Sequence, residues 1–298
     1  MAGFPRCWGC WRGTLPGDGP GTIAVMGDPM SGYTTIRFER RAQIGTLTLA
    51  RPGKRNAQNP VMWQELAHLG EQLLADEDLR CLMVTGEGPS FSAGIDLVEG
   101  LGVLLGPWAD RPPDEDTVAF GLGVAGTFNW IPRLRCPSLA AVRGHAIGGG
   151  LQLALACDFR IFAENAQVGV TETRYGLLPD MGATFRLPRI VGESRARELI
   201  LLGDVIDAAE ALRIGLANRV VPDEDLESAA EELATRLAAQ PPLALTGARR
   251  AIDAAWYRDP EASFRVAVEE QVRCLTSEDF KEARQALAEG RTPKWQGR

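Results

Sequence analysis

Two short segments near the start of the patterned chain alternate between apolar and polar residues. Residues 34–39 and 44–49 both repeat with a period of two, and a polar turn at 40–42 separates them. Such alternation is typical of strands that bury one face, and the short turn predicts a β-hairpin. Structure is therefore expected to begin near residue 34.

Later apolar runs are shorter and do not alternate. Residues 82–85 and 138–142 are apolar at almost every position, which is typical of strands buried on both faces. Two further strands are expected at 158–163 and 168–170. Each of the two apolar runs is followed by a loop that contains glycine, so the sheet is expected to carry glycine-bearing loops at its edge.

Helical periodicity fills the rest of the chain. The first helix is expected to open at Asn59 or Pro60, with Leu66, Leu69, Leu73 and Leu74 on its inner side. Another is expected near 118–130, and from Glu193 onward the pattern is almost wholly helical, at 193–202, 207–213, 224–239, 242–257, 261–276 and 279–289. Strands and helices thus alternate over the first two thirds and helices fill the last third, which predicts an α/β fold with a helical C-terminal region.

The longest glycine cluster lies between a predicted strand and a predicted buried helix. Gly148, Gly149 and Gly150 follow the apolar run 138–142 and precede the apolar run 153–157. Glycine allows positive φ and close approach, and the first turn of a helix leaves its N–H groups free for an anion or a developing oxyanion. A tight turn in which glycine serves packing alone explains the pattern equally well.

A second glycine-bearing loop, residues 86–97, follows the strand at 82–85. If the two strands are neighbours, the N–H groups of Ala93 and Gly149 are expected to converge on one oxygen and form an oxyanion hole. Removing one donor of this kind typically raises a reaction barrier by about 2.7–4 kcal/mol. The sequence has only two histidines, His68 and His145, and lacks a Gly-x-Ser-x-Gly elbow, so a Ser-His-Asp hydrolase is not expected.

Two carboxylates, Glu172 and Asp180, remain as candidates for proton transfer. Both lie in an irregular segment that follows the strand at 168–170. A helix cap before residues 183–187 is an equally good explanation of Asp180. For Glu172, burial among Tyr175, Leu177 and Leu178 is expected to raise the carboxyl pKa, which suits a general base.

Composition narrows the class of protein. The 298 residues carry a net charge of −7, which argues against a general nucleic-acid binder. The six cysteines are too scattered for a disulfide scaffold, and the Cys7-x-x-Cys10 pair lacks the partners of a zinc site, so no metal is expected. No apolar run approaches the length of a membrane span, and no signal peptide is evident. A cytoplasmic protein with no membrane partner is expected.

Four motifs together resemble the crotonase family, the enoyl-CoA hydratase/isomerase superfamily. They run from Arg51 to Ala57, from Phe91 to Leu97, from Gly144 to Gly150 and from Glu172 to Gly182. The resemblance implies a crotonase-like spiral of repeated strand-strand-helix units over residues 33–223. It also implies an oligomerisation region of helices over 224–298, which forms a homotrimer or a dimer of trimers. Residues 1–32, rich in Gly and Pro, are expected to be a disordered tail or an over-extended start.

The resemblance also implies the ligand. An acyl-CoA thioester is expected as substrate, with its carbonyl held by Ala93 and Gly149; coenzyme A is part of that substrate, and no separate cofactor is expected. Coenzyme A is expected to contact Lys54 and Arg55, whose charges suit phosphates, and the segment Gly94, Ile95 and Asp96.

One position departs from the family pattern. Family hydratases use two glutamates; one falls on Glu172, but the other falls on Gln152, whose amide does not exchange a proton near neutral pH. This pattern favours double-bond isomerisation by Glu172 alone. Hydration of a 2-enoyl-CoA, a dienoyl-CoA isomerase that uses Glu172 and Asp180, and a non-catalytic acyl-CoA binder are the alternatives.

Overall fold

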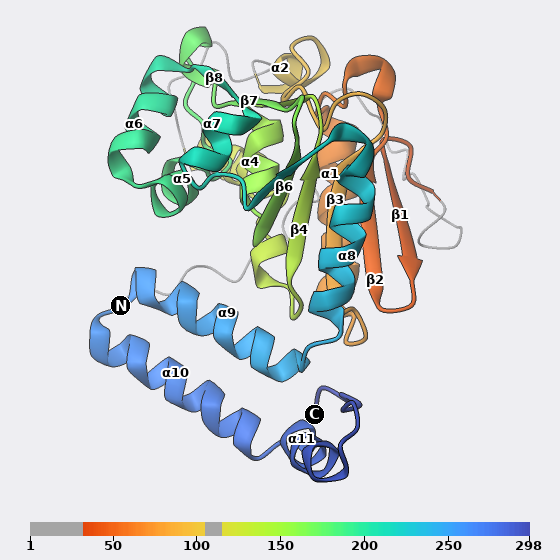
Figure 1. Cartoon of the computed structure of the whole chain (residues 1–298). Coiled ribbons are helices and arrows are strands. Elements are labelled where there is room, and N and C mark those ends of the chain that lie inside the picture. Colours follow the sequence, from red (N-terminus) through yellow and green to blue (C-terminus); the bar gives the residue numbers. More distant parts are fainter. Residues whose placement is uncertain (1–31, 105–114) are drawn as a thin grey trace, which may run out of the picture.

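The computed structural model describes residues 32–104 and 115–298, so the expectation for the N-terminal tail lies outside the described residues except at its last position. At its centre is a six-stranded sheet (Figure 1). Its strands, in spatial order, are β1 (Ile36–Arg41), β2 (Ile44–Leu49), β3 (Cys81–Gly86), β4 (Ser138–Val142), β6 (Phe159–Ala163) and β9 (Arg219–Val221).

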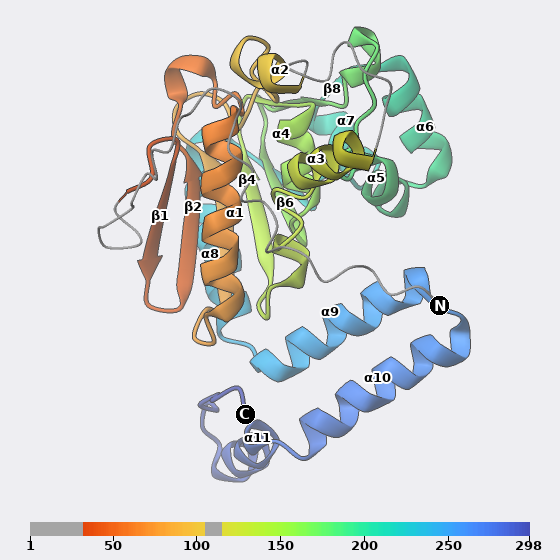
Figure 2. The ribbon, with the colours of Figure 1, turned by 180° about the vertical axis from the view of Figure 1, so that it is seen from behind.

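The pairing of these strands follows the hydrophobic pattern. β1 and β2 form the expected antiparallel hairpin, and every later pair in this sheet is parallel. All five residues of β4 are buried, because helices cover both faces of the sheet, with α1 (Pro60–Ala75) on one side and α8 (Leu226–Ala238) on the other (Figures 1 and 2). As expected, Asn59 caps α1, its side chain accepting a hydrogen bond from the Met62 N–H at 3.0 Å.

A second, three-stranded sheet lies beside the first. It consists of β5 (His145–Ile147), β7 (Gln167–Gly169) and β8 (Val205–Asp207). The prediction of an almost wholly helical chain after Glu193 is therefore wrong at β8 and β9. Each of these strands has only three residues, which is too short to show a period of two.

Short helices connect the strands. They are α2 (Glu99–Leu104), α3 (Glu115–Ala125), α4 (Gly149–Leu155), α5 (Ala183–Val191), α6 (Glu193–Leu202) and α7 (Ala208–Arg213). Single turns of 3₁₀ helix occur at Pro52–Lys54, Ile131–Arg133, Glu172–Tyr175 and Asp223–Asp225. The buried Cys81 and Cys157 belong to the core, as their apolar surroundings predict.

The chain ends in α9 (Pro242–Tyr257), α10 (Pro260–Leu275) and α11 (Glu278–Glu289), which project from one end of the sheet (Figures 1 and 2). None of the residues of α10 is buried, and Phe264, Val268 and Val272 on it are exposed. Within the described residues, no helix is long and apolar enough to cross a membrane.

Candidate active site

The two glycine-bearing loops lie side by side, as their sequence positions predict. β3 and β4 are parallel neighbours, and the loop after β3 continues the pairing beyond the sheet edge. Ser92 donates its N–H to the carbonyl of His145 at 2.8 Å, and Ile147 donates its N–H to the carbonyl of Ser92 at 3.0 Å. Ser92 and Ala146 of β5 therefore form an isolated parallel bridge, and residues 92–95 run on from it.

Gln58 lies on the other side of residues 92–95. Its N–H donates to the carbonyl of Gly94 at 2.7 Å, and its carbonyl accepts from the N–H of Asp96 at 2.8 Å. In a parallel bridge of this kind the bonded groups flank one residue, here Ile95, whose own N–H faces away.

This register corrects the predicted oxyanion hole. The Ala93 N–H donates to the carbonyl of Arg55 at 2.8 Å, so that donor is occupied within the fold. Among the described residues, the N–H groups of Ile95 and Gly149 have no hydrogen-bond partner. Ala93 and Ile95 are two positions apart on an extended segment, so both N–H groups lie on the same edge of it. The sequence alone could not determine which of the two is free to face the site.

Close packing explains the glycine cluster, and each glycine meets a different neighbour. A Cβ on Gly148, which has φ +53°, would lie 3.1 Å from Oε1 of Glu172. A Cβ on Gly149 would lie 3.0 Å from Oε1 of Gln58, and one on Gly150 would lie 2.5 Å from the carbonyl oxygen of Ser92. The bare backbone thus brings Gly148 beside the carboxylate of Glu172 and Gly149 beside the segment that carries Ile95.

Glu172 begins the 3₁₀ turn after β7, and its carboxylate is buried beside the glycines. Gln152, on α4, donates from Nε2 to Oε1 of Glu172 at 2.7 Å. The other oxygen of the carboxylate, Oε2, is buried and has no hydrogen-bond partner among the described residues. A buried oxygen without a partner is rare in native proteins and is typical of a group that acts on a bound molecule.

Burial raises the pKa of the Glu172 carboxyl above its ordinary value. The hydrogen bond from Gln152 opposes this shift, and the charge of Asp180 adds to it. The predicted source of the burial is wrong, however. Tyr175, Leu177 and Leu178 are exposed, and the carboxylate is enclosed instead by the glycine turn and by Gln152.

Asp180 is not a helix cap. α5 begins at Ala183 with Gly182 as its N-cap, and the Asp180 side chain accepts no hydrogen bond from the first turn of this helix. Within the described chain, the Asp180 carboxylate makes no ion pair, and the hydrogen bond that it accepts comes from its own backbone N–H. Desolvation by the surrounding chain raises its pKa, although much of the residue is open to solvent. Its charge also helps to raise the pKa of Glu172.

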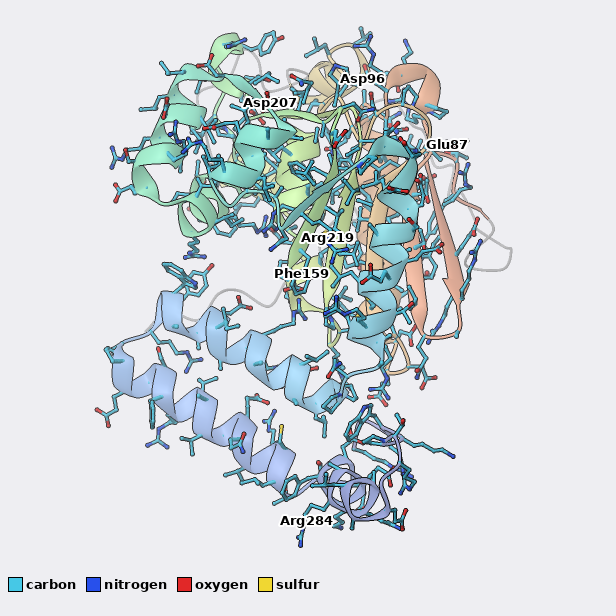
Figure 3. The ribbon with its side chains drawn as sticks, in the orientation of Figure 1. Glu87, Asp96, Phe159, Asp207, Arg219 and Arg284 are labelled. Atoms are coloured by element: carbon cyan, nitrogen blue, oxygen red, sulfur yellow. The ribbon has the colours of Figure 1, made fainter. Side chains whose placement is uncertain are left out.

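The residues expected to hold coenzyme A divide into two kinds. Lys54 and Arg55 are exposed, and their side chains make no ion pair with any other described residue. The carboxylate of Asp96, in contrast, already has partners within the fold. It accepts hydrogen bonds from the N–H groups of Val98 and Glu99 at 3.0 Å and forms an ion pair with Arg51 at 3.1 Å. These contacts give Asp96 a structural role at the start of α2, where Figure 3 shows it at the opposite end of the molecule from Arg284 of α11.

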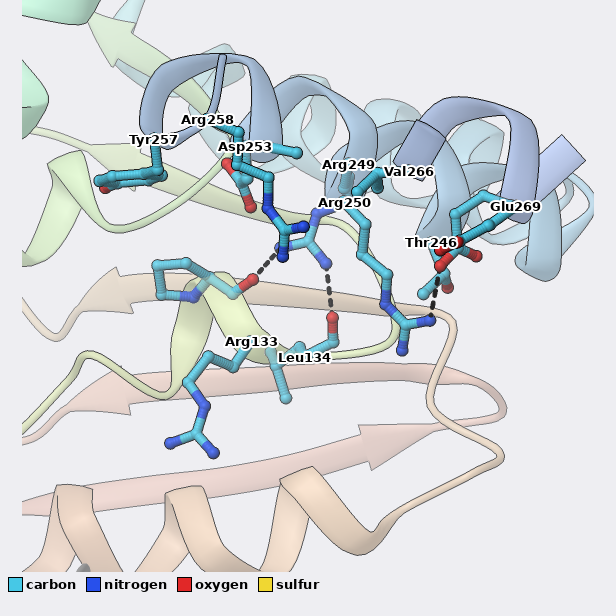
Figure 4. A pocket seen from close by; sticks show the side chains of 13 residues that line it. Arg133, Leu134, Thr246, Arg249, Arg250, Asp253, Tyr257, Arg258, Val266 and Glu269 are labelled. Carbon is cyan, nitrogen blue, oxygen red and sulfur yellow. Dashed lines mark hydrogen bonds and ion pairs between the residues drawn. The ribbon is translucent and has the colours of Figure 1, made fainter. Parts of the chain in front are cut away.

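Two other features do not contribute to this site. His68 and His145 are hydrogen-bonded to Tyr33 and Ser90, respectively. A cavity of about 600 Å³ lies between α9, α10 and residues 132–134, but no residue predicted for the site lines it. Arg249 closes one wall by donating to the carbonyl of Leu134 at 2.6 Å (Figure 4).

The chain is similar to several known proteins. The chain is 36% identical over 272 residues to carnitinyl-CoA dehydratase of Citrobacter koseri, covering 89% of this chain and 99% of that protein. It is 33% identical over 262 residues to crotonyl-CoA hydratase of Syntrophomonas wolfei, covering 87% and 96%, respectively. The structure is similar to the crystal structure of enoyl-CoA hydratase from Bacillus anthracis, with a TM-score of 0.80, 33% identity and coverage of 89% of this chain and 100% of that one.

The family itself is matched over nearly the whole of the described chain. Residues 39–298 match the enoyl-CoA hydratase/isomerase family. The expected crotonase-like α/β fold is confirmed by the TM-score above. The chain belongs to the enoyl-CoA hydratase/isomerase family of enzymes.

Proposed function

We propose that the protein relocates a double bond in an enoyl-CoA, with Glu172 as the proton carrier. The observation that carries this proposal is the pair Glu172 and Gln152. One oxygen of the carboxylate is held by the amide, and the other is buried without a partner. The position where a second glutamate would stand is an amide, so a single carboxylate both takes and returns the proton.

The reaction uses groups that the fold leaves unoccupied. The thioester carbonyl oxygen accepts from the N–H groups of Ile95 and Gly149. Oε2 of Glu172 removes a proton from carbon 2 of a 3-enoyl thioester, and the electron pair of that C–H bond forms an enolate with its charge on the thioester oxygen. The protonated Glu172 then returns the proton to carbon 4, which yields the 2-enoyl thioester. The two N–H groups stabilise the enolate, and the raised pKa of Glu172 suits a base that must also act as an acid.

Hydration of a 2-enoyl-CoA is the second candidate. It adds the hydroxyl of water at carbon 3 and a proton at carbon 2, which is easiest with two proton carriers. Asp180 supports it, because the charge of this carboxylate helps to raise the pKa of Glu172 and the residue is not used as a cap. The names of the relatives, a crotonyl-CoA hydratase and a carnitinyl-CoA dehydratase, also support it. The same carboxylate pair supports a dienoyl-CoA isomerase.

The coenzyme A end of the substrate is proposed to contact Lys54 and Arg55. Their exposed charges have no partner in the described chain and suit the phosphates of coenzyme A. Replacing both with Gln should raise KM for an acyl-CoA while kcat changes little, since these contacts are the same in substrate and transition state.

An absorbance assay separates the candidates. Isomerisation of a 3-enoyl-CoA creates conjugation with the thioester, and hydration of crotonyl-CoA removes it. We expect the wild type to turn over the 3-enoyl-CoA faster than crotonyl-CoA. Faster loss of crotonyl-CoA absorbance would favour hydration, and binding without change of either substrate would favour a non-catalytic acyl-CoA binder.

A further inference from the structure

Gln58 joins the two segments that carry the free N–H groups. Its backbone forms the parallel bridge around Ile95, with hydrogen bonds of 2.7 and 2.8 Å. Its side chain extends past that segment, and Nε2 donates to the carbonyl oxygen of Gly149 at 3.0 Å. One fully buried residue therefore contacts both sides of the site.

The orientation of this amide is determined by its neighbours. Trp63, in the first turn of α1, has a ring N–H that can only donate, and it points at Oε1 of Gln58 at 3.4 Å. The amide nitrogen must then face the Gly149 carbonyl, which can only accept. Gln58 thus connects α1, the Ile95 segment and the glycine turn, and in each of its hydrogen bonds a donor faces an acceptor.

The packing around this connection leaves little room for another arrangement. A Cβ on Gly149 would lie 3.0 Å from Oε1 of Gln58 and 3.5 Å from Cγ1 of Ile95. A Cβ on Gly94 would lie 2.5 Å from the carbonyl oxygen of Ile147 and 3.4 Å from the nitrogen of Gly149. The separation of the Ile95 and Gly149 N–H groups is therefore determined by close contacts, and Gln58 is the side chain that bonds across it.

We propose that Gln58 is a positioning residue: it does not touch the substrate but holds the N–H groups of Ile95 and Gly149 at the separation that one thioester oxygen requires. The proposal rests on the proposed oxyanion hole. Misplacing such a donor affects the enolate more than the ground-state thioester, since charge develops on the oxygen only during reaction. Loss of the side-chain bond should then lower kcat more than it raises KM.

The test is Gln58→Met, which keeps the length and unbranched shape of the side chain but removes its donor. We expect kcat for the preferred enoyl-CoA to fall by about 10- to 100-fold while KM changes by less than about threefold. Gln72→Met is the matched control, because Gln72 lies on α1 and the only hydrogen bond of its side chain in the described chain is with Tyr33. The control should retain the wild-type kcat and KM.

A binding measurement separates this proposal from the proposed reaction. A 3-arylpropenoyl-CoA absorbs at longer wavelength when its carbonyl is polarised, so the shift on binding reports the hole without any turnover. We expect a clear shift with wild type and with Gln72→Met and a smaller one with Gln58→Met. Wild type that shifts the absorbance but turns over no enoyl-CoA would contradict the proposed reaction and leave this test intact.

A second variant covers the case in which Gln58→Met does not fold. Trp63→Phe removes the donor that orients the Gln58 amide but keeps the amide itself, so it should reduce the absorbance shift by a smaller amount in the same direction. An unchanged shift and unchanged kcat in a folded Gln58→Met protein would overturn the proposal. The proposal would also be overturned if the variants lose activity only in proportion to their loss of melting temperature, while the absorbance shift of the bound 3-arylpropenoyl-CoA stays at its wild-type value.

Discussion

Gln152 donates to Oε1 of Glu172 at 2.7 Å while its own oxygen accepts from the backbone N–H of Ala183 at 3.1 Å. Because the Ala183 N–H can only donate, it fixes the amide with its nitrogen toward the carboxylate. Gln152 therefore orients Glu172 and keeps one of its oxygens occupied. The unoccupied oxygen, Oε2, is left to act on a bound molecule.

Glu172→Gln should remove most of the activity while acyl-CoA binding stays near its wild-type value. The amide has almost the same shape but cannot act as a base or an acid near neutral pH, and general acid–base catalysis is typically worth about 10²–10⁴-fold. Turnover by absorbance and binding by calorimetry on the same samples check this. Activity within a few-fold of wild type would exclude Glu172 as the proton carrier.

The stability of the wild type relative to Glu172→Gln should fall as the pH rises. Burial raises the pKa of Glu172 in the folded protein above the unfolded value of about 4.3. Its contribution to stability is thus fully present below that value and is lost as the pH rises through the raised one. Urea unfolding of both proteins at several pH values from about 4 to 8 measures the difference. A difference that is constant or that grows with pH would contradict the raised pKa.

Gln152→Glu should increase hydration relative to isomerisation. The new carboxylate can still accept from the Ala183 N–H, and its second oxygen would face Glu172 at the distance now occupied by a hydrogen bond, so the two groups must share a proton. The ratio of crotonyl-CoA to 3-enoyl-CoA turnover is the readout. Gln152→Met is the control, since it removes the donor to Glu172 without adding a carboxylate and should lower both activities.

Asp180→Asn should shift the acid limb of kcat/KM to lower pH, because the charge of Asp180 helps to raise the pKa of Glu172. The melting temperature should change little, since no cap is lost. A pH–rate profile and a thermal melt of each protein provide the measurement. A loss of kcat of about 10²-fold or more at every pH would instead place Asp180 in the proton path.

The protein should be a trimer or a hexamer at micromolar concentration. α10 has no buried residue, and Phe264 is 73% exposed beside the exposed Val268 and Val272. Burying such side chains against another copy is favourable by about 1.5–3 kcal/mol for each that is fully covered. Light scattering measures the mass, and a monomer would contradict the prediction. Phe264→Glu should shift the mass toward that of a monomer.

The sequence predicts the long elements well. The bounds of β2, β4, α6 and α9 agree with the predicted ranges, because each has a clear apolar pattern and a glycine or proline close to one end. β5, β8 and β9 have three residues each and are formed by pairing with distant strands. β7 has the same length and is predicted at 168–170, so a local pattern of three residues reveals some of these strands but not all of them.

For the site, the sequence shows which types of residue are present, but not the register in which the segments pair. The glycine cluster and the carboxylate at 172 are visible in the sequence, and the fold brings them together. The prediction of Ala93 as a donor is wrong because its N–H is hydrogen-bonded to the carbonyl of Arg55. Such pairing between distant segments decides which N–H groups are free. Gln58 was missed for a related reason: a lone glutamine between Ala57 and Asn59 looks like a surface residue, and only the fold shows that it is fully buried.

The hydrogen bond from Ala183 to Gln152 has a consequence for how this enzyme can diverge. A backbone N–H serves an amide oxygen and a carboxylate oxygen equally well, so the scaffold already accommodates either side chain at this position. The codons for glutamine and glutamate differ at a single base. A gene for this chain therefore lies one point mutation from a two-carboxylate site, and selection can change the preferred reaction without first rebuilding the backbone around it.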